Sequence, residues 1–204
     1  DIVKSLQEDT AFVWIDRMME PEKSKAIAQL IKEKKLKGLN FVEESKRYYP
    51  NGNLAAQVLG FVGTDDKGLD GLEMVLDDEL KGGIQKELVA TDRNGNAIFG
   101  SVLSKYLPDK GKSVTLTIDA SIQFIAERAL DKAMEDTGAK HASVIVMDPK
   151  SGEILAMANR PTYDPNHYSQ SSDEAFKNIA VTNLYEPGST FKPLIASAAL
   201  ASGK

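Results

Sequence analysis

The most regular hydrophobic pattern of the chain lies between residues 119 and 138. Apolar side chains recur there at i, i+3, i+4, i+7, i+8, i+11 and i+12, a spacing that predicts an amphipathic helix. Asp119 occupies the position of an N-cap and Gly138 that of a stop. The apolar stripe consists of Ile122, Ile125, Ala126, Ala129, Leu130, Ala133 and Met134.

Extended segments are predicted on both sides of that helix. Residues 113–118 read as a strand, and residues 141–159 read as a hairpin around an Asp-Pro-Lys-Ser-Gly turn. Residues 144–147 are apolar throughout, so we expect the first hairpin strand to be buried on both faces. Residues 159–175 are polar and aperiodic, which predicts a long loop of a kind that is often functional or mobile.

The first part of the chain carries a helical pattern. Residues 21–38 predict a helix with Pro21 in its first turn and Gly38 as its stop. Residues 53–63 predict a short helix that is capped by Asn53 and ended by a glycine.

The pattern then changes from helical to extended. Residues 65–83 predict a turn and a second short helix, whereas residues 84–107 contain two alternating runs around Arg-Asn-Gly-Asn, a strong hairpin signal. The polar residues 108–112 follow, and we place a domain boundary there. Two domains, residues 1–107 and 108–204, are therefore expected.

Composition narrows the class of protein. Of the 204 residues, 42% are apolar and 27% charged, which is typical of a folded globular chain. The net charge of −5, without a basic stripe interleaved with aromatics, argues against nucleic acid as a partner. The chain has no cysteine, and its two histidines, His141 and His167, are too isolated for a zinc site. We therefore expect neither a metal nor a cofactor.

The ends of the chain bear on location. No apolar run approaches the ~20 residues of a membrane helix, and no signal peptide precedes the first helix. The chain starts at Asp1 without a methionine and stops at Lys204 inside an apolar run, so both ends look cut. A cytosolic protein and a piece of an anchored protein both fit.

The stretch Tyr-Glu-Pro-Gly-Ser-Thr-Phe-Lys-Pro-Leu, residues 185–194, combines a chain break with reactive side chains. Gly188 allows a sharp turn into a helix, and Pro193 is tolerated within its first turn. Ser189 is then at the helix N-terminus, and Lys192 lies at i+3 on the same face. The apolar residues that follow predict a buried helix.

This arrangement suits a nucleophile and its base. A serine hydroxyl is a weak nucleophile until a neighbouring group takes its proton, and a lysine can do so only when neutral. Burial among few carboxylates would lower the pKa of such a lysine, and the Ser189 amide could stabilise an oxyanion. The alternative is an N-capping serine beside a surface lysine, because Ser-x-x-Lys also arises by chance.

The wider sequence resembles the class B penicillin-binding proteins, the membrane-anchored D,D-transpeptidases that cross-link peptidoglycan. Residues 185–193 resemble their active-site serine motif, one of three motifs in such proteins beside Ser-x-Asn and Lys-Thr-Gly. Residues 114–130 and 142–166 are similar to the strand, helix and hairpin that open their transpeptidase domain. Residues 178–193 are similar to the lead-in to the nucleophile.

The resemblance extends upstream and implies an α+β fold. Residues 1–107 would be an N-terminally incomplete pedestal, or dimerisation, domain, and residues 108–204 the N-terminal part of a transpeptidase domain of the β-lactamase-like kind. The pedestal motifs Arg-x-Tyr-Pro and Gly-x-x-Gly-x-Glu are matched by Arg47, Tyr49, Pro50, Gly68, Gly71 and Glu73. For Arg47 and Glu73 we expect a structural ion pair.

The resemblance also implies roles and partners. Ser189 would be acylated by the penultimate D-alanine carbonyl of a stem peptide ending in D-Ala-D-Ala, with Lys192 as general base, and β-lactam antibiotics would acylate the same serine. A membrane glycosyltransferase, proteins of the divisome or elongasome, and a second copy in a homodimer would be further partners. The full protein would be held in the cell membrane by a single span, with these domains on the extracytoplasmic face.

The chain departs from the family pattern at its end. In the family the Ser-x-Asn and Lys-Thr-Gly motifs lie well beyond the serine motif, and neither is matched before Lys204. We therefore expect this chain alone to be inactive, with half an oxyanion hole. Two alternatives stay open: a scaffold with a degenerate penicillin-binding module, and a β-lactam sensor or β-lactamase.

Overall fold

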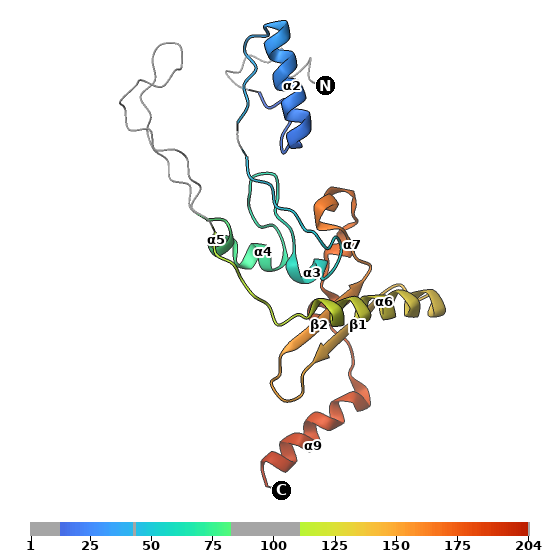
Figure 1. Ribbon diagram of the computed structural model, residues 1–204. Helices are drawn as coiled ribbons and strands as arrows, with labels where there is room; N and C mark the ends of the chain where they lie inside the picture. The colour runs from blue at the N-terminus through green and yellow to red at the C-terminus, as the bar shows by residue number, and fades with distance from the viewer. Residues whose placement is uncertain (1–12, 43, 83–110, 204) are drawn as a thin grey trace.

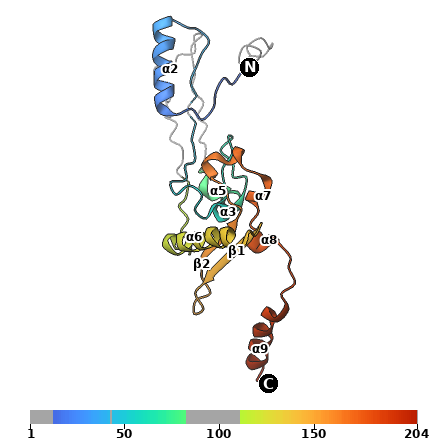
Figure 2. The ribbon, with the colours of Figure 1, turned by 90° about the vertical axis from the view of Figure 1, so that its right-hand side faces the viewer.

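The computed structural model describes residues 13–42, 44–82 and 111–203. The elements are strung along one direction, with α2 at one end, α9 at the other and a packed centre between them (Figures 1 and 2). In chain order they are α2 (Pro21–Lys34), α3 (Ala56–Leu59), α4 (Gly71–Val75), α5 (Asp77–Leu80), α6 (Ala120–Thr137), β1 (Ala142–Met147), β2 (Ile154–Arg160), η1 (Pro165–Gln170), α7 (Asp173–Phe176), α8 (Ile179–Thr182), η2 (Gly188–Phe191) and α9 (Lys192–Ala201), where η marks a 3-10 helix.

The predicted helix and hairpin of the second half are both confirmed. The Asp119 carboxylate accepts the N–H groups of Ser121 and Ile122 at 2.9 Å, and Gly138 ends α6 in the left-handed conformation. Strands β1 and β2 pair antiparallel, with Ala142 opposite Arg160. Helix α6 packs along both strands.

The face that α6 buries is rotated from the apolar stripe. Its buried residues are Gln123, Ala126, Glu127 and Leu130, whereas Ile125 in the stripe is 65% exposed. Gln123 explains the rotation, because its amide pairs with both backbone groups of Met157 in β2. It accepts the Met157 N–H at 2.8 Å and donates to the Met157 carbonyl at 3.0 Å. A polar side chain thus satisfies strand backbone that would otherwise be buried without a partner.

Two predictions around the hairpin are wrong. Strand β1 is not buried on both faces, because α6 covers one face and leaves Ile145 and Met147 on the other half-exposed. Residues 113–118 form no strand. Thr117 donates one side-chain hydrogen bond to the start of β2, and the following Asp119 donates one backbone hydrogen bond, and these do not make a ladder.

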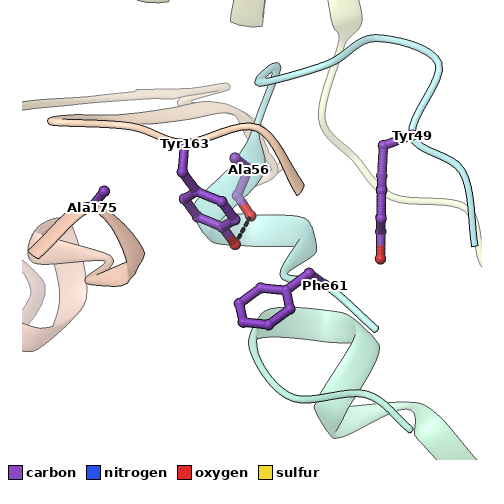
Figure 3. Close-up of a cluster of buried hydrophobic side chains, with 5 residues drawn as sticks. All are labelled: Tyr49, Ala56, Phe61, Tyr163 and Ala175. Atoms are coloured by element: carbon purple, nitrogen blue, oxygen red, sulfur yellow. Dashed lines mark hydrogen bonds between the residues drawn. The ribbon is translucent and has the colours of Figure 1, made fainter. Parts of the chain in front are cut away.

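The predicted long loop instead supplies the core. Residues 159–175 contain η1 and the start of α7, and Tyr163 is buried against the first half of the chain (Figure 3). The Tyr163 hydroxyl donates to the Ala56 carbonyl at 3.1 Å. Phe61 stacks on Tyr168 with ring centroids 4.3 Å apart and meets Tyr163 edge-on at 5.8 Å. The centre of the molecule is therefore built from both halves.

The helices of the first half differ in detail from expectation. Helix α2 is confirmed but ends at a left-handed Lys35, three residues before Gly38. Helix α3 ends at a glycine as predicted, but Ala55, not Asn53, occupies its N-cap position. The second short helix is broken in two at Leu76. The hairpin predicted over residues 84–107 lies outside the described residues.

Candidate active site

Ser189 and Lys192 lie on one continuous turn of helical backbone. The 3-10 turn η2 carries Ser189 and runs directly into α9, whose first residue is Lys192, with Phe191 and Lys192 both in right-handed helical conformation. The Lys192 N–H donates to the Ser189 carbonyl. This three-residue spacing puts both side chains on the same side of the helix, as the sequence predicts.

The approach to the serine is a tight turn. Gly188 has a φ of +52°, and the Thr190 N–H donates to the Pro187 carbonyl at 3.1 Å. Pro193 falls in the first turn of α9, where a missing N–H costs no hydrogen bond. Among the described residues, the Ser189 amide has no acceptor, so it is available to a carbonyl oxygen that gains negative charge.

The expectation of a buried helix after Ser189 is wrong. No residue of α9 is buried, and Leu200 is 79% exposed. Among the described residues, the main contacts of α9 are with η2, the turn that precedes it (Figure 1). Ser189 and Lys192 are exposed as well. The structure therefore brings the two onto one turn without a hydrogen bond between their side chains.

The ion pair expected between Arg47 and Glu73 is present. Arg47 Nε lies 2.7 Å from Glu73 Oε1, and Glu73 is only 6% exposed. A buried carboxylate needs such a partner, because an unpaired charge away from water is costly. The pair joins the chain before α3 to α4.

Tyr49 is fixed at both its backbone and its ring. The Asn166 amide accepts the Tyr49 N–H at 3.0 Å and donates to the Tyr49 carbonyl at 2.9 Å. The Tyr49 hydroxyl accepts the Val62 N–H at 3.1 Å. Burial, assisted by the nearby Glu73 carboxylate, raises the pKa of Tyr49, so the phenol stays neutral. Pro50 follows in a β-turn closed by Gly52.

The two motif glycines allow backbones to touch. A Cβ at Gly68 would lie 2.0 Å from the Glu73 carbonyl oxygen. Gly71 has a φ of +57°, and a Cβ there would lie 2.5 Å from the Gly60 nitrogen. Both positions therefore exclude a side chain, and the close approach places Glu73 beside Arg47.

A buried polar network that the sequence analysis missed links α6 and β2 to α3. The Glu127 carboxylate accepts the Ala55 N–H at 2.8 Å and the Gln123 amide at 2.8 Å. Arg160 donates to Asp131 at 2.9 Å and lies 3.5 Å from Glu127. The Arg160 guanidinium holds the pKa of Asp131 below its usual range. Gln123 and Glu127 interrupt an apolar helix face at i and i+4, and this was the signal available in the sequence.

Gln57 makes a second link of the same kind. Its amide donates to the carbonyls of Pro161 at 2.8 Å and Ala175 at 2.9 Å.

In the described ranges, no group of three or more acidic, histidine or cysteine side chains could hold a metal ion. No helix in these ranges has the length and apolar character to span a membrane.

Two family models match the chain in the order of its two halves. The penicillin-binding protein dimerisation domain matches residues 2–116, and the penicillin binding protein transpeptidase domain matches residues 142–204. The pedestal motif residues fall inside the first match, and Ser189 and Lys192 fall inside the second.

Curated relatives are similar over nearly all of the chain. It is 42% identical over 200 residues to the "Probable peptidoglycan D,D-transpeptidase PenA" of Neisseria gonorrhoeae, covering 97% of this chain and 34% of that protein. It is 36% identical over 192 residues to the peptidoglycan D,D-transpeptidase FtsI of Escherichia coli, covering 94% of this chain and 32% of that one. The chain thus spans about a third of the length of these relatives.

Solved structures share the arrangement. Penicillin Binding Protein 2X from Streptococcus thermophilus superposes with a TM-score of 0.65 at 29% identity, covering 98% of this chain and 32% of that one. Penicillin binding protein 3 from Mycobacterium tuberculosis, complexed with ampicillin, gives a TM-score of 0.61 at 35% identity, covering 78% and 32%.

Proposed function

Because the chain belongs to the class B penicillin-binding proteins, we propose that the full-length protein is a peptidoglycan D,D-transpeptidase with Ser189 as nucleophile. The observation that carries the proposal is the helical turn of Ser189 and Lys192. It opens behind Gly188 with a free amide, inside the segment that matches the transpeptidase domain.

The reaction begins with acylation of Ser189. As general base, Lys192 takes the hydroxyl proton while Ser189 Oγ bonds to the penultimate D-alanine carbonyl carbon. The Ser189 amide donates to the oxygen that becomes negative. The C–N bond to the terminal D-alanine then breaks, and the proton leaves with the amine of that residue. An amine of a second stem peptide then attacks the ester carbonyl carbon, its proton passes through Lys192 to the departing Ser189 Oγ, and the new amide completes the cross-link.

The same chemistry makes the protein a β-lactam target. The strained amide of a β-lactam presents a carbonyl to Ser189 Oγ, and the ring-opened product stays on the serine as an ester. One of the similar structures is complexed with ampicillin, in keeping with this role. We place the full-length protein at the cell membrane, with a glycosyltransferase and proteins of the division or elongation machinery as partners.

Labelling of the full-length protein with a fluorescent penicillin tests the proposal. Wild-type protein is expected to become covalently labelled, and Ser189→Ala to lose all labelling, because the neighbouring Thr190 hydroxyl is turned to the Pro187 carbonyl. Ser202→Ala is the matched control, since this serine lies just beyond the other end of the same helix and hydrogen-bonds only locally. It should label at the wild-type rate.

Two results would contradict the proposal. Labelling that persists in Ser189→Ala would mean that the acylated residue lies elsewhere. A wild-type protein that resists labelling at any penicillin concentration, although folded, would favour the scaffold alternative.

A further inference from the structure

We infer that Asn159 is a positioning residue for the nucleophile: its buried amide fastens α8, the last anchored element before Ser189. The inference rests on the proposed function. Asn159 lies near the end of β2, is 1% exposed, and points away from the face that α6 covers. It touches neither Ser189 nor Lys192, so it would act only through the backbone that joins them.

The Asn159 amide caps α8 from outside the helix. Its oxygen accepts the N–H of Ala180 at 3.0 Å, and Ala180 is the second residue of α8. The first N–H groups of a helix have no partner within it and are usually satisfied by the side chain of the N-cap residue. Here the N-cap residue is Asn178, and its side chain makes no such bond.

Asn178 is turned toward the strand instead. Its amide oxygen accepts a hydrogen bond from the side-chain amide of Asn159 at 2.9 Å, and its nitrogen faces the sulfur of Met157 at 3.3 Å. The two asparagines therefore exchange the usual roles: the strand residue caps the helix, and the helix residue holds the strand residue. Because Asn159 is fully buried, losing its side chain would leave the Ala180 N–H without an acceptor.

Only a short exposed segment separates α8 from Ser189. Helix α8 contacts both β1 and β2, and the chain then runs through residues 183–187 to the turn at Gly188. Residues 183–187 are all exposed. Asn159 thus anchors the end of α8, where the segment that carries Ser189 begins. Because small displacements of a reacting group lower reaction rates strongly, loss of this anchor should slow acylation.

Time-resolved labelling of the full-length protein with fluorescent penicillin tests this role. Asn159→Ala is expected to lower the acylation rate constant about tenfold and to change the dissociation constant of the non-covalent complex less than about twofold, because the substrate contacts remain while the nucleophile is displaced. Asn178→Ala keeps the Ala180 cap and should lower the rate constant less than about threefold. Ser143→Ala, opposite Asn159 on β1 but exposed, should match wild type.

A stability control separates positioning from general destabilisation. Tyr163→Phe removes a buried hydrogen bond to the Ala56 carbonyl, which involves neither Asn159 nor α8, and should lower Tm without lowering the acylation rate constant. If the rate constants of Asn159→Ala and Tyr163→Phe fall in proportion to their loss of Tm, the inference is overturned. An unchanged rate constant in Asn159→Ala overturns it too.

Hydrogen–deuterium exchange of the same proteins does not depend on acylation. Asn159→Ala should speed exchange at least about fivefold in peptides covering residues 179–192, and leave α6 unchanged, because the cap of α8 is lost. If wild-type protein is never labelled, the proposed function fails, and exchange still decides whether Asn159 anchors α8. Equal exchange in wild type and Asn159→Ala would refute the anchoring.

Discussion

The packed centre and the segment that carries Ser189 differ in burial and in the number of side-chain partners. In the centre, Tyr49, Gln57 and Glu73 each have their polar groups satisfied by named partners within the described chain. In α9 no residue is buried, and Lys192 has no hydrogen bond or ion pair from its side chain among the described residues. Within the described residues, the motif residues of the centre therefore have partners, whereas the two motif residues that we propose to be catalytic have none for their side chains.

That contrast distinguishes motif residues that hold the fold together from motif residues that we propose to act on a substrate. The Arg47–Glu73 pair and the close approach at Gly68 complete a local structure and need nothing more. Under the proposed function, Ser189 and Lys192 act on a substrate carbonyl that is not part of the local structure. The contrast predicts that substitutions in one region affect unfolding and those in the other affect acylation, with little crossover.

The largest effect is expected from Lys192→Ala in the full-length protein. Removing the proposed general base should lower the rate of penicillin acylation about 10³-fold and leave Tm within about 2 °C of wild type, because the side chain supports no packing among the described residues. Time-resolved labelling and thermal unfolding measure the two quantities. Lys150→Ala, in the exposed hairpin turn, should change neither. A fall in Tm of more than about 5 °C in Lys192→Ala would break the contrast.

Glu127→Ala should have the converse effect. It leaves the Ala55 N–H without its acceptor and removes a carboxylate beside the buried Arg160, at a cost of about 3 kcal/mol of unfolding free energy. Urea unfolding measures this loss, with the exposed Glu135→Ala on the same helix as control, expected within about 0.5 kcal/mol of wild type. A loss no larger than that of the control would show that the network adds no stability.

Tyr163→Phe sharpens the comparison at a single hydrogen bond. The ring stays packed between Phe61 and Phe176, and only the bond to the Ala56 carbonyl is lost, so about 1 kcal/mol is expected. Tyr185→Phe, in the exposed approach to Ser189, should cost nothing measurable. Equal losses in the two variants would contradict a packed centre beside an open segment.

The smallest effect concerns pH. The hydrogen bond from Arg160 lowers the pKa of Asp131 in the folded protein, so this carboxylate adds stability above its unfolded pKa of ~3.9, and that stability is lost as pH falls through the folded value. Asp131→Asn should therefore lose less Tm than wild type between pH ~5 and ~3. Asp136→Asn, exposed on the same helix, should follow wild type. If the Tm of Asp131→Asn fell with pH as steeply as that of wild type, the Asp131 carboxylate would be excluded as the titrating group.

Local signals in the sequence predicted those parts whose partners are close along the chain. Helix α6 with its Asp119 cap, the hairpin, and the turn at Gly188 all follow from neighbouring residues. The strand expected over 113–118 failed, because a strand needs a ladder with a partner that spacing alone does not identify.

The packed centre could not be predicted, because its polar contacts join distant residues. Asn166 pairs with Tyr49 across 117 positions, and nothing local distinguishes this asparagine from an ordinary loop residue. The turn at Ser189 follows from its own residues, whereas the exposure of the apolar residues after it depends on packing partners that their spacing does not reveal.

Those distant contacts also set an order in time. The hydrogen-bond partners of Gln57 are carbonyls that lie 104 and 118 residues later in the chain. The partner of the Tyr49 backbone is a side chain 117 residues later. A chain that emerges from its N-terminus cannot close this junction until residue 175 is available, and contacts of such long range form slowly. The junction between the two halves therefore forms only after the segment that precedes Ser189 has been synthesised.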